Sequence, residues 1–489
     1  MYPNDNSVSI PPPSNLIMMK EETSDLTNFT SNGNGVLANV EAGHDAVFGD
    51  MEDGDTNYRN VGWIGTVALL MKTMIGLGVL SIPSAFDTLG LIPGIICLLV
   101  IAGITTWSDY IVGVFKLRHP EIYSIGDVGG LLFGRVGREV LGGAFCLFWI
   151  FVAGSGILSI SIGLNAVSTH GACTAIFVAV AAVVGFLLSS IQTLGHISWI
   201  AWVGLTCILT SILVVTIAVG IQDRPAAAPQ TGPWESDYQL FKNPSFTEAI
   251  SAVSSLVFAY AGTPAFFAII AEMRDPRLYN RSLAFCQASV TAFYLAIGIV
   301  VYVFCGSYVA SPALGSAGVL MKKVCYGLAL PGLLATTTIV IHRADADIKL
   351  PAKYIFIRVL RGSRHLTANT AIHWGTWLGC TFGITVTAYL IASGIPVFGG
   401  LVSLIGALLG TFMCFQPYAC MWLYDNWSLG KQERSWRWTA MVAFSVFVIV
   451  SGTFLMIAGT YGSIVSIIDS YKVSGGSAAW TCADNSNSV

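Results

Sequence analysis

The sequence predicts an all-α integral membrane protein with about eleven transmembrane helices, and three observations carry this prediction. Of the 489 residues, 54% are hydrophobic and only 10% are charged, and the mean hydropathy is +0.70. Apolar segments of about 20 residues, the length that crosses a bilayer, recur along the chain. Lys and Arg gather in every second connection between these segments. The composition excludes a soluble protein, and the net charge of −3 gives no sign of a nucleic-acid partner.

The apolar segments divide the chain into three regions. Residues 1–60 are polar and rich in Asn, Ser and Asp, so we expect a disordered cytoplasmic tail rather than a cleaved signal peptide. Residues 61–472 hold the transmembrane domain, and residues 473–489 form a tail on the extracellular or luminal side. The expected spans are residues 63–86, 90–114, 140–165, 172–191, 198–220, 249–272, 283–306, 324–342, 371–392, 395–422 and 438–461.

The distribution of Lys and Arg predicts the orientation. With the N-terminus in the cytoplasm, 18 of the 24 basic residues fall in inner segments, five fall in outer segments, and Lys72 lies within a span. Cytoplasmic segments of membrane proteins carry such an excess. The N-terminus is therefore expected inside, and an odd number of spans places the C-terminus outside. A disulfide is left open among the cysteines near the outer ends, which are Cys173, Cys305, Cys325 and Cys482.

The first span is interrupted near the middle of the bilayer. Gly76 and Gly78 stand close together within it, about one turn after Lys72. Glycine in a helix interior costs about 1 kcal/mol relative to alanine, and bare backbone groups in a membrane need protein or water to bond them. A helix break that lines a binding site explains this pattern. Close packing of a neighbouring helix against the glycines is the alternative.

A second break favours the binding site. In the sixth span the helix is interrupted between Gly262 and Pro264, because proline lacks the backbone donor and clashes with the preceding turn. Interrupted spans at matching positions in two halves of a chain indicate an inverted-repeat transporter. Two five-helix repeats of opposite topology follow, over about residues 61–220 and 249–422, with a helix over 438–461 appended.

Several motifs occur in a fixed order along the spans. They are Ile75-Gly-Leu-Gly-Val-Leu-Ser-Ile-Pro83, Phe258-Ala-Tyr-Ala-Gly-Thr-Pro264, Glu272-Met-Arg-Asp-Pro276 and Pro351-Ala-Lys-Tyr354. With these motifs the chain resembles the amino acid/auxin permease family, above all its fungal neutral amino-acid permeases, over about residues 60–475. The resemblance implies a five-plus-five inverted-repeat fold with broken helices 1 and 6. It also implies secondary active uptake of amino acids, usually coupled to protons.

The residues at the breaks suit an α-amino acid independently of this resemblance. The start of the second half-helix, at Gly78, presents free N–H groups and a positive dipole to a carboxylate. The carbonyl groups that end the other half-helices, near Met74 and Ala259, can receive an ammonium group. We therefore predict substrate contacts from Met74, Ile75, Gly76, Leu77, Gly78, Ser155, Phe258, Ala259, Tyr260, Gly262 and Thr263.

The side chains near the breaks favour neutral, fairly bulky amino acids as substrates. Met74, Phe258, Tyr260 and Phe266 provide large apolar surfaces, and small residues lie between them. No carboxylate or guanidinium group lies beside either break in the sequence. A charged substrate side chain would therefore lack a counter-ion where charge is costly.

Five residues are candidates for ion coupling or gating, namely Lys72, Asp109, Glu272, Thr336 and Thr337. We expect Lys72 to pair with Asp109 or Glu272 at an inner gate, because an unpaired ammonium at its depth costs at least about 2.5–3.5 kcal/mol. A snorkelling or interfacial role is the alternative for the two carboxylates. The two threonines could approach carbonyls of the first helix, a position that corresponds to the cation site of sodium-coupled members of this fold. Bonding back to their own helix is the alternative.

Other functional classes fit the sequence less well. The sequence has no metal-ligand spacing, no nucleophile motif, no phosphate loop and no soluble domain, so we expect neither enzyme activity nor a bound cofactor or metal. The prediction is a proton-coupled symporter in the plasma membrane, with a neutral amino acid, a proton and membrane lipid as partners. A vacuolar exporter of the same family and an amino-acid sensor on a transporter scaffold are the alternatives.

Overall fold

The structure, a computed structural model, describes residues 61–190, 194–225, 227–342, 370–432, 434–473 and 479–486. The predicted tail over 1–60 lies outside the described residues, and so does the basic loop that carries Pro351-Ala-Lys-Tyr354. Within the described ranges the chain is almost entirely helical, and the β-contact found there is an isolated bridge between Val61 and Met273.

The helices follow the order of the predicted spans. The first span consists of α1 (Trp63–Met74), the 3-10 helix η1 (Gly78–Ser81) and α2 (Ile82–Leu89). Spans two to five are α3 (Leu91–Arg118), α4 (Ile125–Ser168), α5 (Thr174–Ser189) and α6 (Leu194–Ile221). The sixth consists of α7 (Phe246–Ala259), the 3-10 helix η2 (Thr263–Ala265) and α8 (Phe266–Ala271).

The remaining spans complete the second half. Spans seven to nine are α9 (Tyr279–Cys305), α10 (Val319–His342) and α12 (Ala371–Gly394). The tenth consists of α13 (Phe398–Ile405), a π-helical turn (Gly406–Gly410), α14 (Thr411–Cys414) and α15 (Gln416–Gln432), and the eleventh is α16 (Trp436–Val473). The 3-10 helices η3 (Pro276–Leu278), η4 (Gly306–Tyr308) and η5 (Ala313–Ser316) lie in connections.

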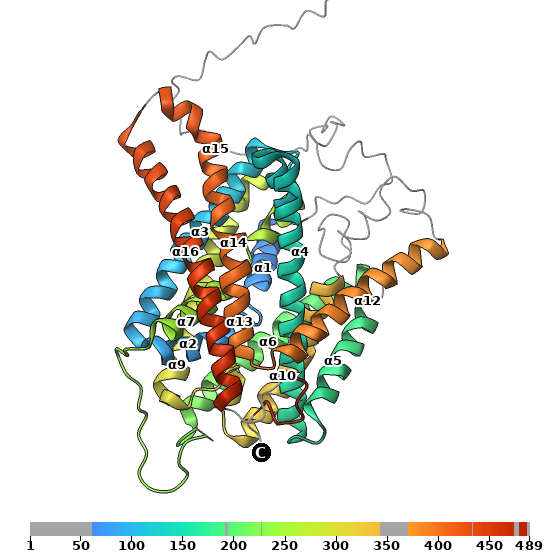
Figure 1. The fold of residues 1–489 in the computed structure, drawn as a ribbon, viewed down its shortest axis with the longest axis vertical. Coiled ribbons are helices and arrows are strands. Elements are labelled where there is room, and N and C mark those ends of the chain that lie inside the picture. Colours follow the sequence, from blue (N-terminus) through green and yellow to red (C-terminus); the bar gives the residue numbers. More distant parts are fainter. Residues whose placement is uncertain are drawn as a thin grey trace, which may run out of the picture.

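These helices confirm the predicted all-α membrane fold. In the described part of the chain, nine helices are long and apolar enough to cross a bilayer, and α1 with its continuation through α2 forms a further span bent by 44°. The shorter apolar helix α5 accounts for the last predicted segment. Figure 1 shows most of these helices side by side along one long axis, with α5 and α12 leaning away from the others.

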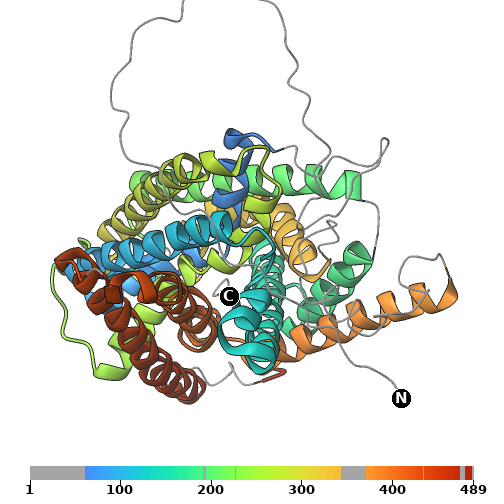
Figure 2. The same cartoon turned by 90° about the horizontal axis from the view of Figure 1, so that it is seen from above.

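Apolar side chains cover the outside of the bundle. Val450, Phe454 and Ile457 of α16 are more than half exposed, and Ile372 and Phe382 are exposed in the same way on α12. Figure 2 shows α12 projecting from one flank of the bundle and α16 lying on another. Such faces suit contact with the acyl chains of membrane lipid.

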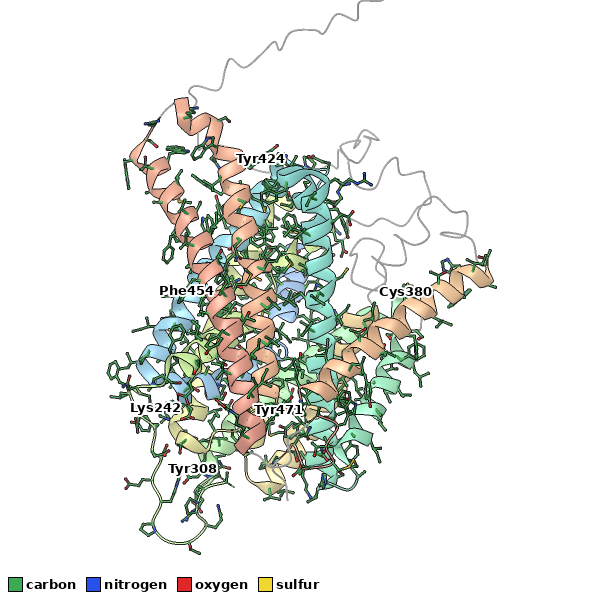
Figure 3. The ribbon with its side chains drawn as sticks, in the orientation of Figure 1. Lys242, Tyr308, Cys380, Tyr424, Phe454 and Tyr471 are labelled. Atoms are coloured by element: carbon green, nitrogen blue, oxygen red, sulfur yellow. A yellow bond between two sulfur atoms is a disulfide. The ribbon has the colours of Figure 1, made fainter. Side chains whose placement is uncertain are left out.

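The two ends of the bundle separate residues that the sequence places on opposite sides of the membrane. Figure 3 shows Lys242, Tyr308 and Tyr471 at one end and Tyr424 at the other. Spans of alternating direction require this separation. Which end faces the cytoplasm stays a prediction.

A disulfide joins Cys173 to Cys482, one of the pairings that the sequence leaves open. The bond holds the described part of the C-terminal segment against the connection between α4 and α5. There the Asn165 amide donates to Asn485 at 2.7 Å, and the Thr174 hydroxyl donates to the Ala483 carbonyl at 2.6 Å. The segment is therefore attached to the transmembrane domain by both covalent and polar contacts.

Candidate functional site

The first helix break lies between α1 and η1. The N–H of Ile75 still donates to the Met71 carbonyl at 2.7 Å, but its ψ of 98° turns the chain out of the helix. Helical turns resume at Gly78, and the two halves meet at 44°. The interruption falls where the sequence predicts it.

The second break lies between α7 and η2. The N–H of Gly262 donates to the Tyr260 carbonyl at 2.8 Å, a tighter turn than an α-helix makes. Pro264 stands in the first turn of η2, where its missing N–H has no helical acceptor to lose. The sixth span is therefore also broken at its predicted position.

The two breaks pack directly against each other. A Cβ atom at Gly78 would lie 2.5 Å from the Cα of Ala259, too close for any side chain. On the other side, a Cβ atom at Gly262 would lie 3.2 Å from the Cγ of Met74. Glycine at these two positions lets the first break contact the end of α7 at Ala259 and lets the second break contact the end of α1 at Met74. At Gly76, by contrast, a Cβ atom would meet nothing within 4 Å, so open space adjoins the first break.

Tyr294 of α9 connects the two breaks. In unbroken helices the Met74 carbonyl would accept from the N–H of Gly78, and the Ala259 carbonyl from the N–H of Thr263. Instead, the hydroxyl of Tyr294 lies 2.7 Å from the carbonyl oxygen of Met74 and 2.9 Å from that of Ala259. Tyr294 is fully buried. Tyr294 was not predicted from the sequence, because nothing there distinguishes it from the other tyrosines of the apolar spans.

Aromatic side chains surround this contact. The ring of Tyr260 packs edge-on against that of Tyr294 with centroids 5.1 Å apart, and the Tyr260 hydroxyl donates to Thr291 at 3.1 Å. Phe258 and Phe266 are buried on the two sides of the second break. The surroundings of the breaks thus have the apolar, aromatic character that the sequence predicts.

Asp109 of α3 lies in the interior close to both breaks. It has no exposed surface, and its Oδ2 accepts a hydrogen bond from the amide of Gln287, which itself lies 3.6 Å from the sulfur of Met74. Thr263 of the second break lies beside Asp109, but its Oγ1 has no hydrogen-bond partner among the described residues. The expectation that no carboxylate lies beside the breaks is therefore wrong in space, because α3 brings Asp109 there.

Three polar atoms of this cluster are buried without a hydrogen-bond partner in the described part of the chain. They are Oδ1 of Asp109, Oε1 of Gln287 and Oγ1 of Thr263. Such atoms are rare in protein interiors and call for a ligand, a water molecule or a proton. The cluster offers a single carboxylate, and no group of three His, Cys, Asp or Glu that could hold a metal ion occurs in the described ranges.

Three other predicted residues have different surroundings. The hydroxyls of Ser155 on α4 and Thr336 on α10 donate to carbonyls of their own helices, at 2.8 Å and 2.9 Å. Thr337 faces Gly156 of α4 and has no hydrogen-bond partner for Oγ1 within the described residues. For Thr336 the alternative reading, bonding back to its own helix, is therefore the observed one.

Two of the predicted gate residues lie at the ends of the half-helices α1 and α8. Lys72 is half-buried close to the end of α1, and Glu272 directly follows α8. Asp109 bonds to Gln287 and not to Lys72, so a gate between Lys72 and Asp109 is not formed in this structure. A gate between Lys72 and Glu272 stays a prediction.

Backbone bonds connect the ends of the two broken spans next to this region. The N–H of Val61 donates to the Glu272 carbonyl at 3.3 Å, and the N–H of Arg274 donates to the Val61 carbonyl at 3.0 Å. The Ser282 hydroxyl donates to the Trp63 carbonyl at 3.0 Å. The start of α1 is thereby joined to the end of α8 and the start of α9.

Two facing helix breaks inside a bundle of apolar spans define a membrane transporter. The family model described as transmembrane amino acid transporter protein matches residues 59–465. The chain belongs to this family, the amino acid/auxin permeases, as the sequence motifs predict. The protein is therefore a transporter and not an enzyme.

Two fungal relatives cover nearly the whole chain, and a third covers half of it. A transmembrane transporter of Gibberella moniliformis is 33% identical over 450 residues, which is 91% of each chain. The N amino acid transport system protein of Neurospora crassa is 31% identical over 89% of this chain and 91% of its own. Vacuolar amino acid transporter 3 of Schizosaccharomyces pombe is 26% identical over 50% of this chain and 36% of its own.

Solved transporters share the fold. The inward-facing conformation of Mhp1 matches with a TM-score of 0.52 at 12% identity, over 88% of this chain and 95% of its own. The substrate-bound, outward-open state of a Na⁺-coupled sialic acid symporter matches with a TM-score of 0.50 at 13% identity, over 84% of this chain and 92% of its own. At such low identity the likeness concerns the fold alone, and it confirms the predicted transporter architecture.

Proposed function

We propose that this protein is a proton-coupled symporter that takes up neutral, fairly bulky amino acids by alternating access. The observation that carries the proposal is the pair of carbonyl groups, of Met74 and Ala259, that face a single point where the breaks meet. A positively charged group with three N–H donors suits two such acceptors, and the α-ammonium of an amino acid is one. N–H groups at the start of η1, from Gly78 on, suit the carboxylate of the same molecule.

The side chains around the breaks support neutral substrates. Phe258, Tyr260 and Phe266 are buried aromatic residues, and the open space beside Gly76 leaves room for an apolar side chain. Asp109 lies nearby, but its burial and its bond to Gln287 oppose a role as counter-ion for a cationic substrate. The relative from Neurospora crassa is an amino acid transport system protein, which supports an amino acid as the substrate.

The cluster around Asp109 supports a proton as the coupling ion. A charged carboxylate in a protein interior carries a large desolvation cost, and a bound proton removes that cost. Gln287 connects Asp109 to Met74 of the first break, and Thr263 belongs to the second. Protonation of Asp109 would therefore change the charge beside both breaks, which can couple the two ligands.

Uptake by the purified protein in liposomes tests this function. We expect radiolabelled phenylalanine to accumulate under an inward pH gradient and to leave again when a protonophore collapses the gradient. Unlabelled neutral amino acids should compete, whereas lysine and glutamate should not. Uptake that ignores the gradient would contradict proton coupling, and equal competition by lysine would contradict neutral selectivity.

A vacuolar exporter is the second candidate, because one relative is a vacuolar amino acid transporter. We propose the plasma membrane as the location, with the N-terminus in the cytoplasm. A fluorescent fusion expressed in fungal cells separates the two locations directly. Ligand binding without measurable net flux would instead favour an amino-acid sensor.

A further inference from the structure

We propose that the hydroxyl of Tyr294 takes the place of the substrate ammonium in the empty transporter and must move aside when substrate binds. The inference rests on the proposed function and goes beyond it, because it assigns a residue to the conformational step in which the empty protein returns. Two features carry it: the position of the hydroxyl, and the bonding capacity of the two carbonyls that it contacts.

The hydroxyl stands at the point where an ammonium group would bind. Its oxygen lies 2.7 Å from the carbonyl oxygen of Met74 and 2.9 Å from that of Ala259. An ammonium nitrogen at the same point would make both bonds with two separate protons, whereas the hydroxyl has one proton to share between two acceptors. The ammonium also carries a charge, and charge-assisted bonds are the stronger ones. Substrate can therefore displace the hydroxyl, and the two cannot occupy the point together.

The proposal requires only a small displacement of Tyr294. The hydroxyl needs to move by about the length of one hydrogen bond, roughly 3 Å, to vacate the point. The neighbouring ring of Tyr260 is held separately, since its own hydroxyl donates to Thr291 at 3.1 Å.

This exchange allows the empty protein to return to the conformation that is open to the other side of the membrane. Buried carbonyl groups without donors are unfavourable in a protein interior and above all in a membrane. In the loaded protein the substrate bonds the carbonyls of Met74 and Ala259, and in the empty protein Tyr294 does. Both states therefore keep the two breaks satisfied while the half-helices rearrange. A transporter without this hydroxyl should change readily between its two conformations only when substrate is bound.

The variant Tyr294→Phe tests the proposal against a permanent structural role. We expect it to bind phenylalanine about threefold to tenfold more tightly, because the substrate no longer competes with a hydroxyl. Exchange of internal for external amino acid should persist, whereas net uptake should fall by about tenfold. A permanent link between the breaks predicts the opposite, namely weaker binding as the breaks separate. An unchanged or raised Kd would overturn the proposal.

Tyr302→Phe provides the matched control. Tyr302 lies on the same helix, is fully buried, and its hydroxyl contacts the backbone of Gln239 at 3.0 Å, away from the breaks. This variant loses one buried hydroxyl too, and it should leave both the Kd and the ratio of exchange to net uptake unchanged. Equal effects in the two variants would show a general loss of packing and overturn the proposal.

A second measurement keeps the hydroxyl and does not depend on the folding of Tyr294→Phe. We expect the ¹⁹F resonance of 3-fluorotyrosine, placed at position 294, to shift when phenylalanine is added to the purified protein. A resonance that does not move on saturation would overturn the proposal. If the wild-type protein takes up no amino acid at all, the proposed function is wrong. Uptake by wild type with a raised Kd in Tyr294→Phe rejects the inference alone.

Discussion

The hydroxyl of Tyr294 lies 2.7 Å from the carbonyl oxygen of Met74, so a residue of the seventh span bonds the broken end of the first. A helix that stops in the middle of a bilayer leaves carbonyl groups without their usual donors. The protein supplies a donor from a different helix, and the same donor reaches Ala259 of the sixth span at 2.9 Å. The breaks are thereby held together at the point where the proposed substrate would bind.

Alanine at Gly78 should strongly reduce transport. The added Cβ would lie 2.5 Å from the Cα of Ala259. Because both atoms are fixed by the backbone, neither can rotate away, and the two breaks must separate. Overpacking of this kind costs about 1–3 kcal/mol and misplaces the substrate contacts. We expect the rate of phenylalanine uptake to fall at least about tenfold, while the protein still reaches the membrane.

Alanine at two further glycines should reduce uptake less than alanine at Gly78. Gly262→Ala should be milder, because its Cβ would meet the flexible Cγ of Met74 at 3.2 Å. Gly103→Ala on α3 should have no effect, because its Cβ would meet nothing within 4 Å. Uptake and surface abundance measured in the same cells would check the order. Normal uptake by Gly78→Ala would contradict the model of facing breaks.

Much of the fold could be predicted from the sequence because it depends on local properties. The apolar length of a span and the presence of glycine or proline within it are visible without any neighbour, so the order of the spans and both breaks agree with the prediction. The bounds agree less well, because α4 begins at Ile125 instead of 140 and α16 ends at Val473 instead of 461. The π-helical turn Gly406–Gly410 in the tenth span was not predicted. It packs against the sixth span, since a Cβ at Gly406 would lie 2.0 Å from the Ser254 carbonyl oxygen, and such a contact is not local.

The central contacts of the site were harder to predict for a related reason. Tyr294 on α9 and Asp109 on α3 lie on helices that carry apolar residues all around. Hydrophobic periodicity indicates the inward face only when the other face is polar, and in a membrane the outer face is apolar too. The sequence could therefore nominate Asp109 as a coupling residue without placing it beside Gln287. Nothing in the sequence distinguished Tyr294 from the other tyrosines.

The disulfide between Cys173 and Cys482 provides a test of the orientation. If these cysteines face the outside, a membrane-impermeant maleimide should label intact cells only after treatment with an impermeant reducing agent. The free cysteines that the structure describes are buried or half-buried, so they should add little signal. Cys173→Ser/Cys482→Ser provides the control and should stay unlabelled. Labelling of the wild type that requires permeabilised cells would reverse the predicted orientation.

Asp237, in the connection between α6 and α7, should make the docking of that connection depend on pH. Burial acts to raise the pKa of Asp237, but hydrogen bonds from the Ser307 hydroxyl and N–H, at 2.5 Å and 2.7 Å, and the charge of Lys242 lower it overall. Because the folded-state pKa is lowered, the stabilisation is complete above the ordinary pKa of about 3.9. It is lost as the pH falls through the folded-state value.

Limited proteolysis of this connection at several pH values would measure the effect. Cleavage of the wild type should accelerate only in acid below the ordinary range of aspartate. In Asp237→Asn the rate should be higher at neutral pH and should no longer change in that acid range. Glu235→Gln, on the same connection, should behave like the wild type. A wild type whose cleavage rises with increasing pH would contradict the sign of this prediction.

The last prediction concerns Asp109, the buried carboxylate between the breaks. Asparagine has nearly the same shape as a protonated aspartate, and it can still accept a hydrogen bond from Gln287 through its carbonyl oxygen. Asp109→Asn should therefore bind phenylalanine with a Kd within about threefold of wild type, because the contacts of both breaks are preserved. It should lose the ability to accumulate phenylalanine under a pH gradient, because the coupling proton has no site. Exchange across the membrane should continue and should no longer respond to pH.

Asp469→Asn, which removes an exposed carboxylate paired with Lys472, controls for the loss of charge and should accumulate phenylalanine normally. Proton-driven accumulation by Asp109→Asn at the wild-type level would exclude Asp109 as the coupling residue, and the unpartnered oxygen atoms around it would then have to be explained by buried water.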